Sequence, residues 1–272
     1  MLAKMKNRVK KLLGLPLPPK PYEIVADTDA ELFGWYRRDT CELYKGFAIT
    51  PEDTFVDVGC GEGGNCVFAA QCGAAKVIAT DIDPERIETV AKHMAAEAQA
   101  RSFEAHVSDS NPLPLASGIA TKVVCQEVLE HVEDPPAVLA ELVRIGKPGA
   151  QYLVSVPDPV SESVQKHVAP SCHWEKPNHL RIFEREQFAR VVREAGLTIE
   201  TRASYSFFWA MWWALFWADV RVMKFGTPGS PVLRHWNKTW RALLESPNGA
   251  AVRKALDATM PKSQVILARL AA

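Results

Sequence analysis

The chain has 272 residues, 47% of them hydrophobic, and its 32 basic residues balance its 32 acidic residues. This length favours one domain with additions over two full domains, and the composition fits a soluble globular protein. The charge is segregated, however, because residues 1–22 carry six basic and no acidic residues, and residues 221–272 carry nine basic against two acidic. Two basic ends therefore flank an acidic body, which disfavours nucleic acid as a partner.

The first 27 residues are predicted to form a basic leader and a proline-rich linker. The apolar run Leu12–Leu17 is too short and too interrupted for a signal peptide, and Pro16–Pro21 is typical of an extended linker. The six cysteines form no CxxC pair, which favours reduced thiols. We therefore expect a cytoplasmic protein.

A helix is predicted over Thr28–Phe47, before the first strand. Its apolar and aromatic residues recur along the segment, and Asp27 or Thr28 is a suitable N-cap. The simplest expectation is an amphipathic helix that packs on the sheet.

The stretch Thr54–Asn65 reads TFVDVGCGEGGN and is predicted to be a buried strand, a glycine-rich turn and the start of a helix. Such a turn lets the backbone approach a ligand where its amides point outward. The pattern Gly59-x-Gly61-x-x-Gly64 matches the dinucleotide fingerprint, which alone is weak evidence. Asp57 would repel a pyrophosphate and suits a ligand with a positive end, such as an ammonium or a sulfonium.

Strands and helices are predicted to alternate along the rest of the chain, which is typical of an α/β fold with a mainly parallel sheet. The expected strands are Lys76–Thr80, Phe103–Val107, Lys122–Cys125, Gln151–Val156, Leu197–Arg202 and Lys262–Leu270. The expected helices are Pro84–Ala98, Pro135–Ile145 and Glu184–Ala195.

An insertion, Ala203–Pro261, separates the last two expected strands. It begins with Ser204–Ala218, which holds four of the eight tryptophans and is apolar on every face of a helix. As a helix, Ala203–Val220 reaches about 27 Å, which is marginal against a bilayer core of about 30 Å. We reject a span, because it would separate the last strand from its sheet. The segment is either a hydrophobic lid over the active site or a helix in the membrane interface.

Five motifs, VDVGCGEGG, VIATDID, VSDS, QEVLEH and RIGKPG, stand in the order found in class I S-adenosylmethionine (SAM) dependent methyltransferases, which the chain resembles over residues 51–157. The resemblance implies a Rossmann-like α/β fold. We expect a seven-stranded, mainly parallel sheet with helices on both faces and a large insertion before the last strand. The chain is then divided into the leader and linker (1–27), the SAM-binding core (28–202), the Trp-rich insertion (203–261) and the final strand (262–272).

The resemblance also implies SAM as the cofactor. Asp81 lies 20 residues after Gly61 and is expected to bind the ribose hydroxyls, although it also precedes a helix that it could cap. Ile82 is expected to pack on the adenine, and Asp109 either holds the adenine amino group or forms a turn. The implied cofactor residues are Asp57, Gly59, Gly61, Asp81, Ile82, Asp109 and Gln126. If the segment before the first strand closes over the cofactor, as in this family, the active site is also lined by Trp35, Tyr36 and Arg38.

Gln126–His131 directly follows the fourth strand, where His131 is either a general base or part of a helix start without chemistry. On one helical face, Glu127, Glu130 and His131 would bind a divalent cation. This pattern resembles the ubiquinone-pathway O-methyltransferases and the small-RNA 2′-O-methyltransferases, and His179, a better match than His173, would complete the site. Mg²⁺, Mn²⁺, Fe²⁺ and Zn²⁺ all suit such ligands, and the cation would lower the pKa of a substrate hydroxyl. The alternative is an ordinary loop with His179 as a structural donor.

We expect SAM-dependent O-methylation of a hydroxyl on a sugar or glycan, a glycolipid or a prenylated phenol. The expected partner is therefore a small-molecule, glycan or lipid-linked acceptor, with peripheral contact at the inner face of the membrane as an alternative setting. The other functions left open are metal-independent N- or C-methylation of a small molecule and a non-catalytic SAM-binding, membrane-associated protein. A nicotinamide dehydrogenase is disfavoured by Asp57 and the later motifs.

Overall fold

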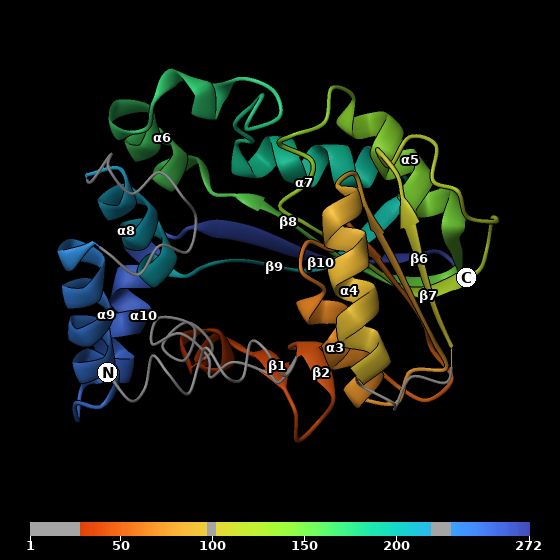
Figure 1. The fold of residues 1–272 in the computed structure, drawn as a ribbon, viewed down its shortest axis with the longest axis horizontal. Coiled ribbons are helices and arrows are strands. Elements are labelled where there is room, and N and C mark those ends of the chain that lie inside the picture. Colours follow the sequence, from red (N-terminus) through yellow and green to blue (C-terminus); the bar gives the residue numbers. More distant parts are fainter. Residues whose placement is uncertain (1–27, 97–101, 219–229) are drawn as a thin grey trace.

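The computed structural model describes residues 28–96, 102–218 and 230–272, so the predicted leader and linker lie outside the described residues. Its main element is a seven-stranded sheet with the order β6-β5-β4-β7-β8-β10-β9 (Figure 1). The strands are β4 (Thr54–Val58), β5 (Lys76–Asp81), β6 (Phe103–Val107), β7 (Ala120–Gln126), β8 (Gly146–Pro157), β9 (Leu197–Tyr205) and β10 (Ser263–Leu270).

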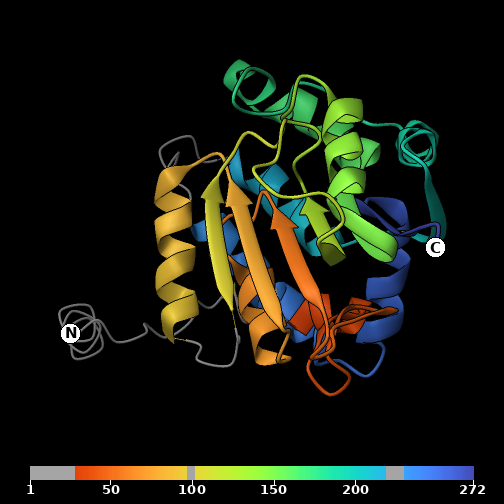
Figure 2. The same ribbon diagram turned by 90° about the vertical axis from the view of Figure 1, so that its right-hand side faces the viewer.

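The sheet is mainly parallel, as predicted. Strand β4 pairs in parallel with β5 and with β7, whereas β10 is antiparallel to both β8 and β9. Figure 2 shows β4, β5 and β6 running side by side in one direction. The carboxyl ends of the parallel strands therefore meet at one edge, where ligands bind in open α/β sheets.

Helices cover both faces of the sheet, because side chains that alternate along each strand are apolar on both sides. Phe55 packs toward α3 (Gly64–Gln71) and α4 (Pro84–Ala96), whereas Val56 packs toward α5 (Pro135–Ile145) and α7 (Arg185–Glu194). This arrangement confirms the predicted fold class. Two further elements were not predicted, α6 (Pro159–Val168) and the short 3₁₀ helix η1 (Ser171–Trp174).

The predicted helix over Thr28–Phe47 is wrong. Only residues 28–33 are helical, and a small antiparallel sheet follows, made of β1 (Trp35–Arg37), β2 (Glu42–Tyr44) and β3 (Phe47–Ala48). Gly34 and Gly46 have φ angles of +102° and +86°, which an α-helix does not permit. The aromatic residues that suggested a helical stripe instead pack from short strands into the core below the main sheet.

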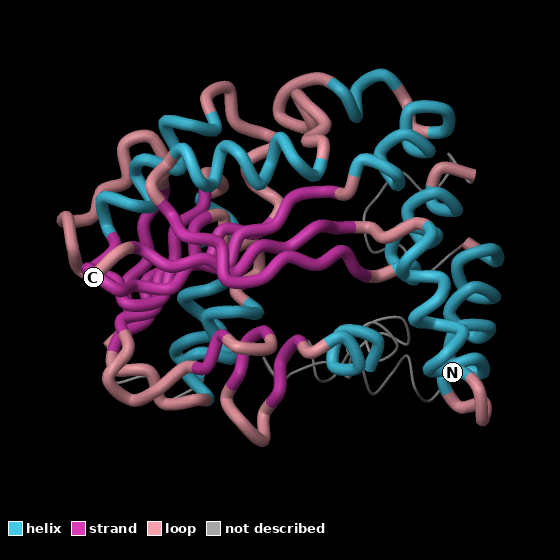
Figure 3. The backbone as a smooth tube through the Cα atoms, turned by 180° about the vertical axis from the view of Figure 1, so that it is seen from behind, coloured by secondary structure: helices cyan, strands magenta, loops and turns pink. Residues whose placement is uncertain are grey.

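The insertion between β9 and β10 contains α8 (Phe207–Phe216), α9 (Pro231–Leu244) and α10 (Gly249–Thr259). These helices stand together at one end of the sheet, beyond the ends of β8, β9 and β10 (Figures 1 and 3). Their apolar side chains form a third core, centred on Phe208, Trp212 and Trp240. Among the described residues, no helix has the length and hydropathy needed to cross a membrane.

The six cysteines are all free thiols. Three of them, Cys60, Cys66 and Cys125, are buried, and burial raises the pKa of each thiol above its usual range. These thiols therefore stay protonated and serve as packing side chains rather than nucleophiles.

Candidate active site

The glycine-rich turn between β4 and α3 is held against the neighbouring strand. The backbone amides of Gly59 and Cys60 both donate to the carbonyl oxygen of Thr80, at 2.8 and 2.9 Å. Gly59 has a φ of +73°, and a Cβ atom there would lie 2.2 Å from Cγ2 of Val128. Glycine is therefore required at this position by both its backbone angle and its contact with the turn after β7.

Asp81 fastens this turn to the end of β5. Its carboxylate accepts hydrogen bonds from the amides of Gly61, at 2.8 Å, and Asp83, at 3.0 Å, and Nη1 of Arg86 lies 3.8 Å away. The next residue, Ile82, is 71% exposed, the largest exposed fraction among the large apolar side chains of the described residues. Polar and apolar groups thus lie side by side where the ribose and adenine were predicted to bind.

Asp109 lies in the loop after β6 and is exposed. Its Oδ1 accepts a hydrogen bond from the amide of Asn111 at 3.2 Å, which is the local turn expected as its alternative role. This bond engages one carboxylate oxygen in the turn and is the only hydrogen bond of that side chain within the described residues.

Asp57 and Gln126 lie deeper at the same edge. Asp57 is 1% exposed and accepts a hydrogen bond from the Cys66 thiol at 3.7 Å, and burial raises the pKa of its carboxyl to about 7. Gln126, at the end of β7, accepts a hydrogen bond from Nδ2 of Asn65 at 2.7 Å. Asn65 belongs to α3, so this bond joins the glycine-rich turn to β7.

Of the three residues expected to line the site from the N-terminal segment, one lies beside the turn. The Tyr36 hydroxyl donates to Oδ1 of Asn65 at 3.0 Å. Trp35 is only 2% exposed within the core, and Arg38 donates to the side chain of Gln71.

The segment after β7 is a series of tight turns, so the expected helical face shared by Glu127, Glu130 and His131 is not formed. Glu127 has a φ of +54°, and the amide of His131 donates to the carbonyl of Val128 at 2.9 Å. The Glu127 carboxylate forms an ion pair with Lys262 and accepts a hydrogen bond from the Ser155 hydroxyl at 3.1 Å. Glu127 is therefore already engaged by protein groups.

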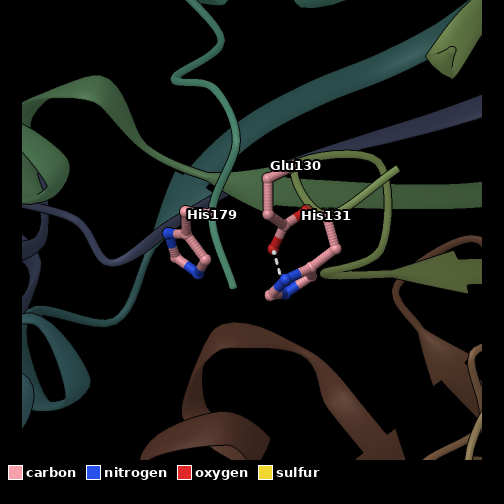
Figure 4. A group of neighbouring side chains, drawn as sticks. All are labelled: Glu130, His131 and His179. Atoms are coloured by element: carbon pink, nitrogen blue, oxygen red, sulfur yellow. Dashed lines mark ion pairs between the residues drawn. The ribbon is translucent and has the colours of Figure 1, made fainter. Parts of the chain in front are cut away.

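Glu130, His131 and His179 do come together, as predicted (Figure 4). Glu130 is 1% exposed, and neither of its carboxylate oxygens has a hydrogen-bond partner among the described residues. Nε2 of His131 lies 3.7 Å from Oε1 of Glu130, and the rings of His131 and His179 are 5.0 Å apart. Burial, and next the nearby Glu127, raise the pKa of Glu130 well above its usual range.

The tautomer of His131 follows from its contacts. Its Nδ1 lies 3.1 Å from the carbonyl oxygen of Pro177, which only accepts, so Nδ1 carries the hydrogen and Nε2 has a free lone pair. Burial, and next the proximity of His179, lower the pKa of His131. His131 is therefore a neutral imidazole with an available Nε2.

His179 also belongs to a second cluster of side chains, with Glu162 and His173. Oε2 of Glu162, on α6, lies 2.7 Å from Nδ1 of His179, and the rings of His173 and His179 are 4.4 Å apart. Sequence reasoning missed Glu162 because it missed α6. The available signal was Asp158-Pro159, an N-cap residue followed by a proline suited to a first helical turn.

Lys262 was also missed, because it was read only as the start of the last strand. Its backbone amide donates to the carbonyl oxygens of Tyr205 and Ser206, and its own carbonyl accepts from the Asp158 amide at 2.8 Å. The ammonium group is mostly buried beside Glu127, and although burial alone would lower the pKa of Lys262, the carboxylates around it raise it. A fixed positive charge therefore faces the acidic groups.

One cavity of about 630 Å³ is lined by the acidic, imidazole and ammonium groups described above, from Glu127 to Lys262. Its opposite wall is aromatic and comes from α8, with the rings of Trp213, Phe216 and Trp217. Trp217 also donates to the side chain of Gln165 on α6. None of the four tryptophans of Ser204–Ala218 is exposed, because α8 packs against α6, α9 and α10.

A model for a methyltransferase domain matches residues 29–202. Norajmaline N-methyltransferase from Rauvolfia serpentina is 25% identical over 130 residues, which are 48% of this chain and 42% of that protein. The ubiquinone biosynthesis O-methyltransferase of Thiobacillus denitrificans is 29% identical over 183 residues, 62% of this chain and 75% of the relative. The matched region thus spans less than half the length of the N-methyltransferase and three quarters of the O-methyltransferase.

The fold is shared with solved structures as well. The [4+2]-cyclase SpnF aligns with a TM-score of 0.58 over 100% of this chain and 96% of its own, at 15% sequence identity. At that identity the likeness shows the fold alone, and a cyclase shares this fold with enzymes that transfer methyl groups.

Proposed function

This chain belongs to the class I SAM-dependent methyltransferases, and we propose that it transfers the methyl group of SAM to a hydroxyl oxygen of an acceptor bound in the cavity beneath α8. The observation that carries the proposal is the position of His131. A neutral imidazole with a free Nε2 lines a cavity that opens beside the predicted cofactor edge, at the carboxyl end of β7.

The cofactor is proposed to bind along the carboxyl edge of β4, β5 and β6. Exposed Ile82 would contact the adenine, and Asp81 would accept the ribose hydroxyls at the turn containing Gly59 and Gly61. Asp57, Asp109 and Gln126 complete the proposed set around that turn. Support comes from the family match and from the exposure of Ile82 directly after Asp81.

In the proposed reaction His131 is the base. SAM supplies an electrophilic methyl group on a sulfonium. As the bond between sulfur and methyl carbon breaks, the acceptor oxygen forms its bond to the same carbon, and its proton passes to Nε2 of His131. Glu130, 3.7 Å from that nitrogen, lies where it would stabilise the imidazolium that results. The chain otherwise contributes by holding the acceptor in line and excluding water.

A divalent cation is proposed in the same cavity, and the residues present fit one. Both oxygens of the buried Glu130 lack a partner among the described residues, and a buried carboxyl without a partner is costly unless a ligand meets it. One ligand set, from the residues expected in the sequence, would be Glu130, His131 and His179, whereas Glu127 is held by Lys262. Such a cation lowers the pKa of a hydroxyl that it binds. In this arrangement His131 is a ligand instead of a base.

The acceptor class is proposed to be a hydroxylated sugar or glycan, a glycolipid or a prenylated phenol. The cavity offers one polar wall of carboxylates and imidazoles, and one aromatic wall with Trp213 and Trp217. Pockets of this kind bind ligands that have an apolar face and a few oriented polar groups. The lid role of α8 in this proposal needs no membrane, whereas the predicted contact of the basic ends with a membrane falls partly on residues outside the described ranges.

The test is methyl transfer from isotopically labelled SAM to matched acceptor pairs, each a hydroxylated compound and its amine analogue. We expect label in a methyl ether, identified by mass spectrometry, and none in the amine products. Label found only in methylamines would replace O-methylation with N-methylation, the reaction named for the Rauvolfia relative. Full turnover in excess chelator would show that the reaction needs no cation, and His131 would then act as the base.

A further inference from the structure

We propose that a divalent cation in this cavity is held by Glu162, His173 and His179, next to His131 rather than through it. This set shares His179 with the set of Glu130, His131 and His179, so a cation can occupy only one of the two. These residues come from α6, from η1 and from the loop that follows it, and none but His179 belongs to the ligand set expected from the sequence. The existence of this site does not depend on the proposed function, but its role beside the acceptor does.

The three ligand atoms are already grouped. One ligand atom from each residue lies within 4.8 Å of the other two. Oε2 of Glu162 is 2.7 Å from Nδ1 of His179, and the rings of His173 and His179 are 4.4 Å apart. The contact between Glu162 and His179 is a hydrogen bond, so a cation bound at Nδ1 would replace it, with the imidazole proton moving to Nε2 or to solvent. Ligands of one cation need such spacing, because bonds of about 2.0–2.2 Å bring them to within a few ångströms of each other.

The backbone holds the group in place. The amide of His179 donates to the carbonyl of His173 at 3.0 Å, and the side chain of Asn178 donates to the carbonyl of Cys172 at 2.9 Å. Glu162 is fixed on α6, whose first turn is capped by Asp158. Little rearrangement is therefore needed for a cation to bind.

The chemistry of the donors suits a transition metal. One carboxylate and two imidazoles are typical ligands of Zn²⁺, Fe²⁺, Mn²⁺ or Co²⁺. Nε2 of His173 is buried and has no hydrogen-bond partner among the described residues.

This position also resolves a conflict at His131, which cannot be both a ligand of the cation and the base that takes the acceptor proton. A cation held by Glu162, His173 and His179 leaves Nε2 of His131 free to take the acceptor proton. The rings of His131 and His179 are 5.0 Å apart, so cation and base would face the same acceptor hydroxyl. Lys262 lines the same cavity, and its ion pair with Glu127 offsets its charge.

The experiment is a titration of the full-length, SAM-free protein with Co²⁺, followed by visible absorption of the bound ion. We compare the wild type with Glu162→Gln, His173→Gln and Glu130→Gln, and with His167→Gln, an exposed histidine of the same helix, as the matched control. Glu162→Gln and His173→Gln should weaken Co²⁺ binding by about 100-fold or more, since changes in groups around a ligand already cost 10–100-fold. Glu130→Gln and His167→Gln should stay within about threefold.

Three results would overturn the proposal: no Co²⁺ bound by the wild type, binding lost in Glu130→Gln but kept in His173→Gln, or binding lost in all three pocket variants. Should Glu162→Gln fail to fold, Co²⁺ binding by His173→Gln still decides the outcome, because His173 is only partly buried. Methyl transfer is measured separately. A chain that binds Co²⁺ through Glu162 but transfers no methyl group would refute the proposed function and leave this site standing.

Discussion

The cofactor edge and the acceptor cavity lie at the same end of the sheet but are built differently. The cofactor edge is made largely of backbone: the turn at Gly59 and Gly61 is held by amides that bond to Thr80 and Asp81. The acceptor cavity is made of side chains from five separate segments, with acidic and imidazole groups opposite an aromatic helix. It also holds buried polar atoms, the carboxylate oxygens of Glu130 and Nε2 of His173, that have no hydrogen-bond partner among the described residues.

This difference indicates which part of the molecule tolerates amino-acid substitutions. A backbone-built site depends on a few positions that exclude side chains, and it can be shared by enzymes with different chemistry. A site built from side chains can change its acceptor by exchanging residues on α6, α8 or the loop around His173, with the sheet intact. Substitutions at the cofactor edge should therefore affect folding or SAM binding, and those in the cavity should affect turnover.

Gly59→Ala should give the largest effect and tests the backbone half of this comparison. Its Cβ atom would meet Val128 at 2.2 Å, and its φ of +73° disfavours alanine. We expect a loss of about 2–4 kcal/mol in the free energy of unfolding, measured by denaturant titration. Gly73→Ala is the control, because Gly73 has a similar φ of +79° but no atom within 4 Å, and it should lose only about 1 kcal/mol. Equal losses would show that the contact with Val128 is unimportant.

Asp81→Ala should weaken SAM binding by about 1.5–3 kcal/mol, because charge-assisted hydrogen bonds to the ribose are lost. Isothermal titration calorimetry measures the change directly. Asp109→Asn, at an exposed residue with a local turn bond, should lose less. A parent-like affinity in Asp81→Ala would refute the assignment of Asp81 to the ribose.

Asp29 tests the cavity half of this comparison, because it is hydrogen-bonded to the start of α8, which carries the aromatic wall, and to α9. It accepts hydrogen bonds from Trp240, at 3.0 Å, and Ser206, at 3.3 Å, and burial, followed by the neighbouring Asp257, raises its pKa to about 6. The folded state therefore binds this proton more tightly than the unfolded chain. The stabilisation is present below about pH 4 and is lost as the pH rises through 6.

Asp29→Asn should remove this pH dependence. Relative to the wild type, the variant should gain about 1–2 kcal/mol in the free energy of unfolding between pH 4 and pH 7, as followed by thermal or denaturant unfolding. Asp39→Asn, which changes a surface carboxyl, should follow the wild-type curve. If the free energy of unfolding changed with pH in the same way for wild type and Asp29→Asn, the buried carboxyl of Asp29 would not contribute to the pH dependence of stability.

The sequence predicted best where a signal is local. The strand, turn and helix around Gly59 are encoded in a dozen consecutive residues, and the remaining strands each appear as a short apolar run. The segment after Thr28 was predicted wrongly, because its aromatic spacing suits a helix while Gly34 and Gly46 break one. For the cavity, three of the four predicted ligands, Glu130, His131 and His179, lie together, whereas Glu127 does not join them.

The rest of the cavity depends on distant contacts that no local pattern specifies. Glu162 lies on a helix that was not predicted, and Lys262 reaches Glu127 across 135 residues of chain. The ion pair of Lys262 with Glu127 could only be found once β10 was placed between β8 and β9.

The most direct test of the account compares SAM binding with turnover in His131→Gln. SAM affinity is measured by calorimetry, and release of S-adenosylhomocysteine is measured with a hydroxylated acceptor that the wild type methylates. We predict that the variant binds SAM with the affinity of the wild type and releases no S-adenosylhomocysteine above background. Turnover at the wild-type rate, or a loss of SAM binding equal to the loss of turnover, would contradict the account.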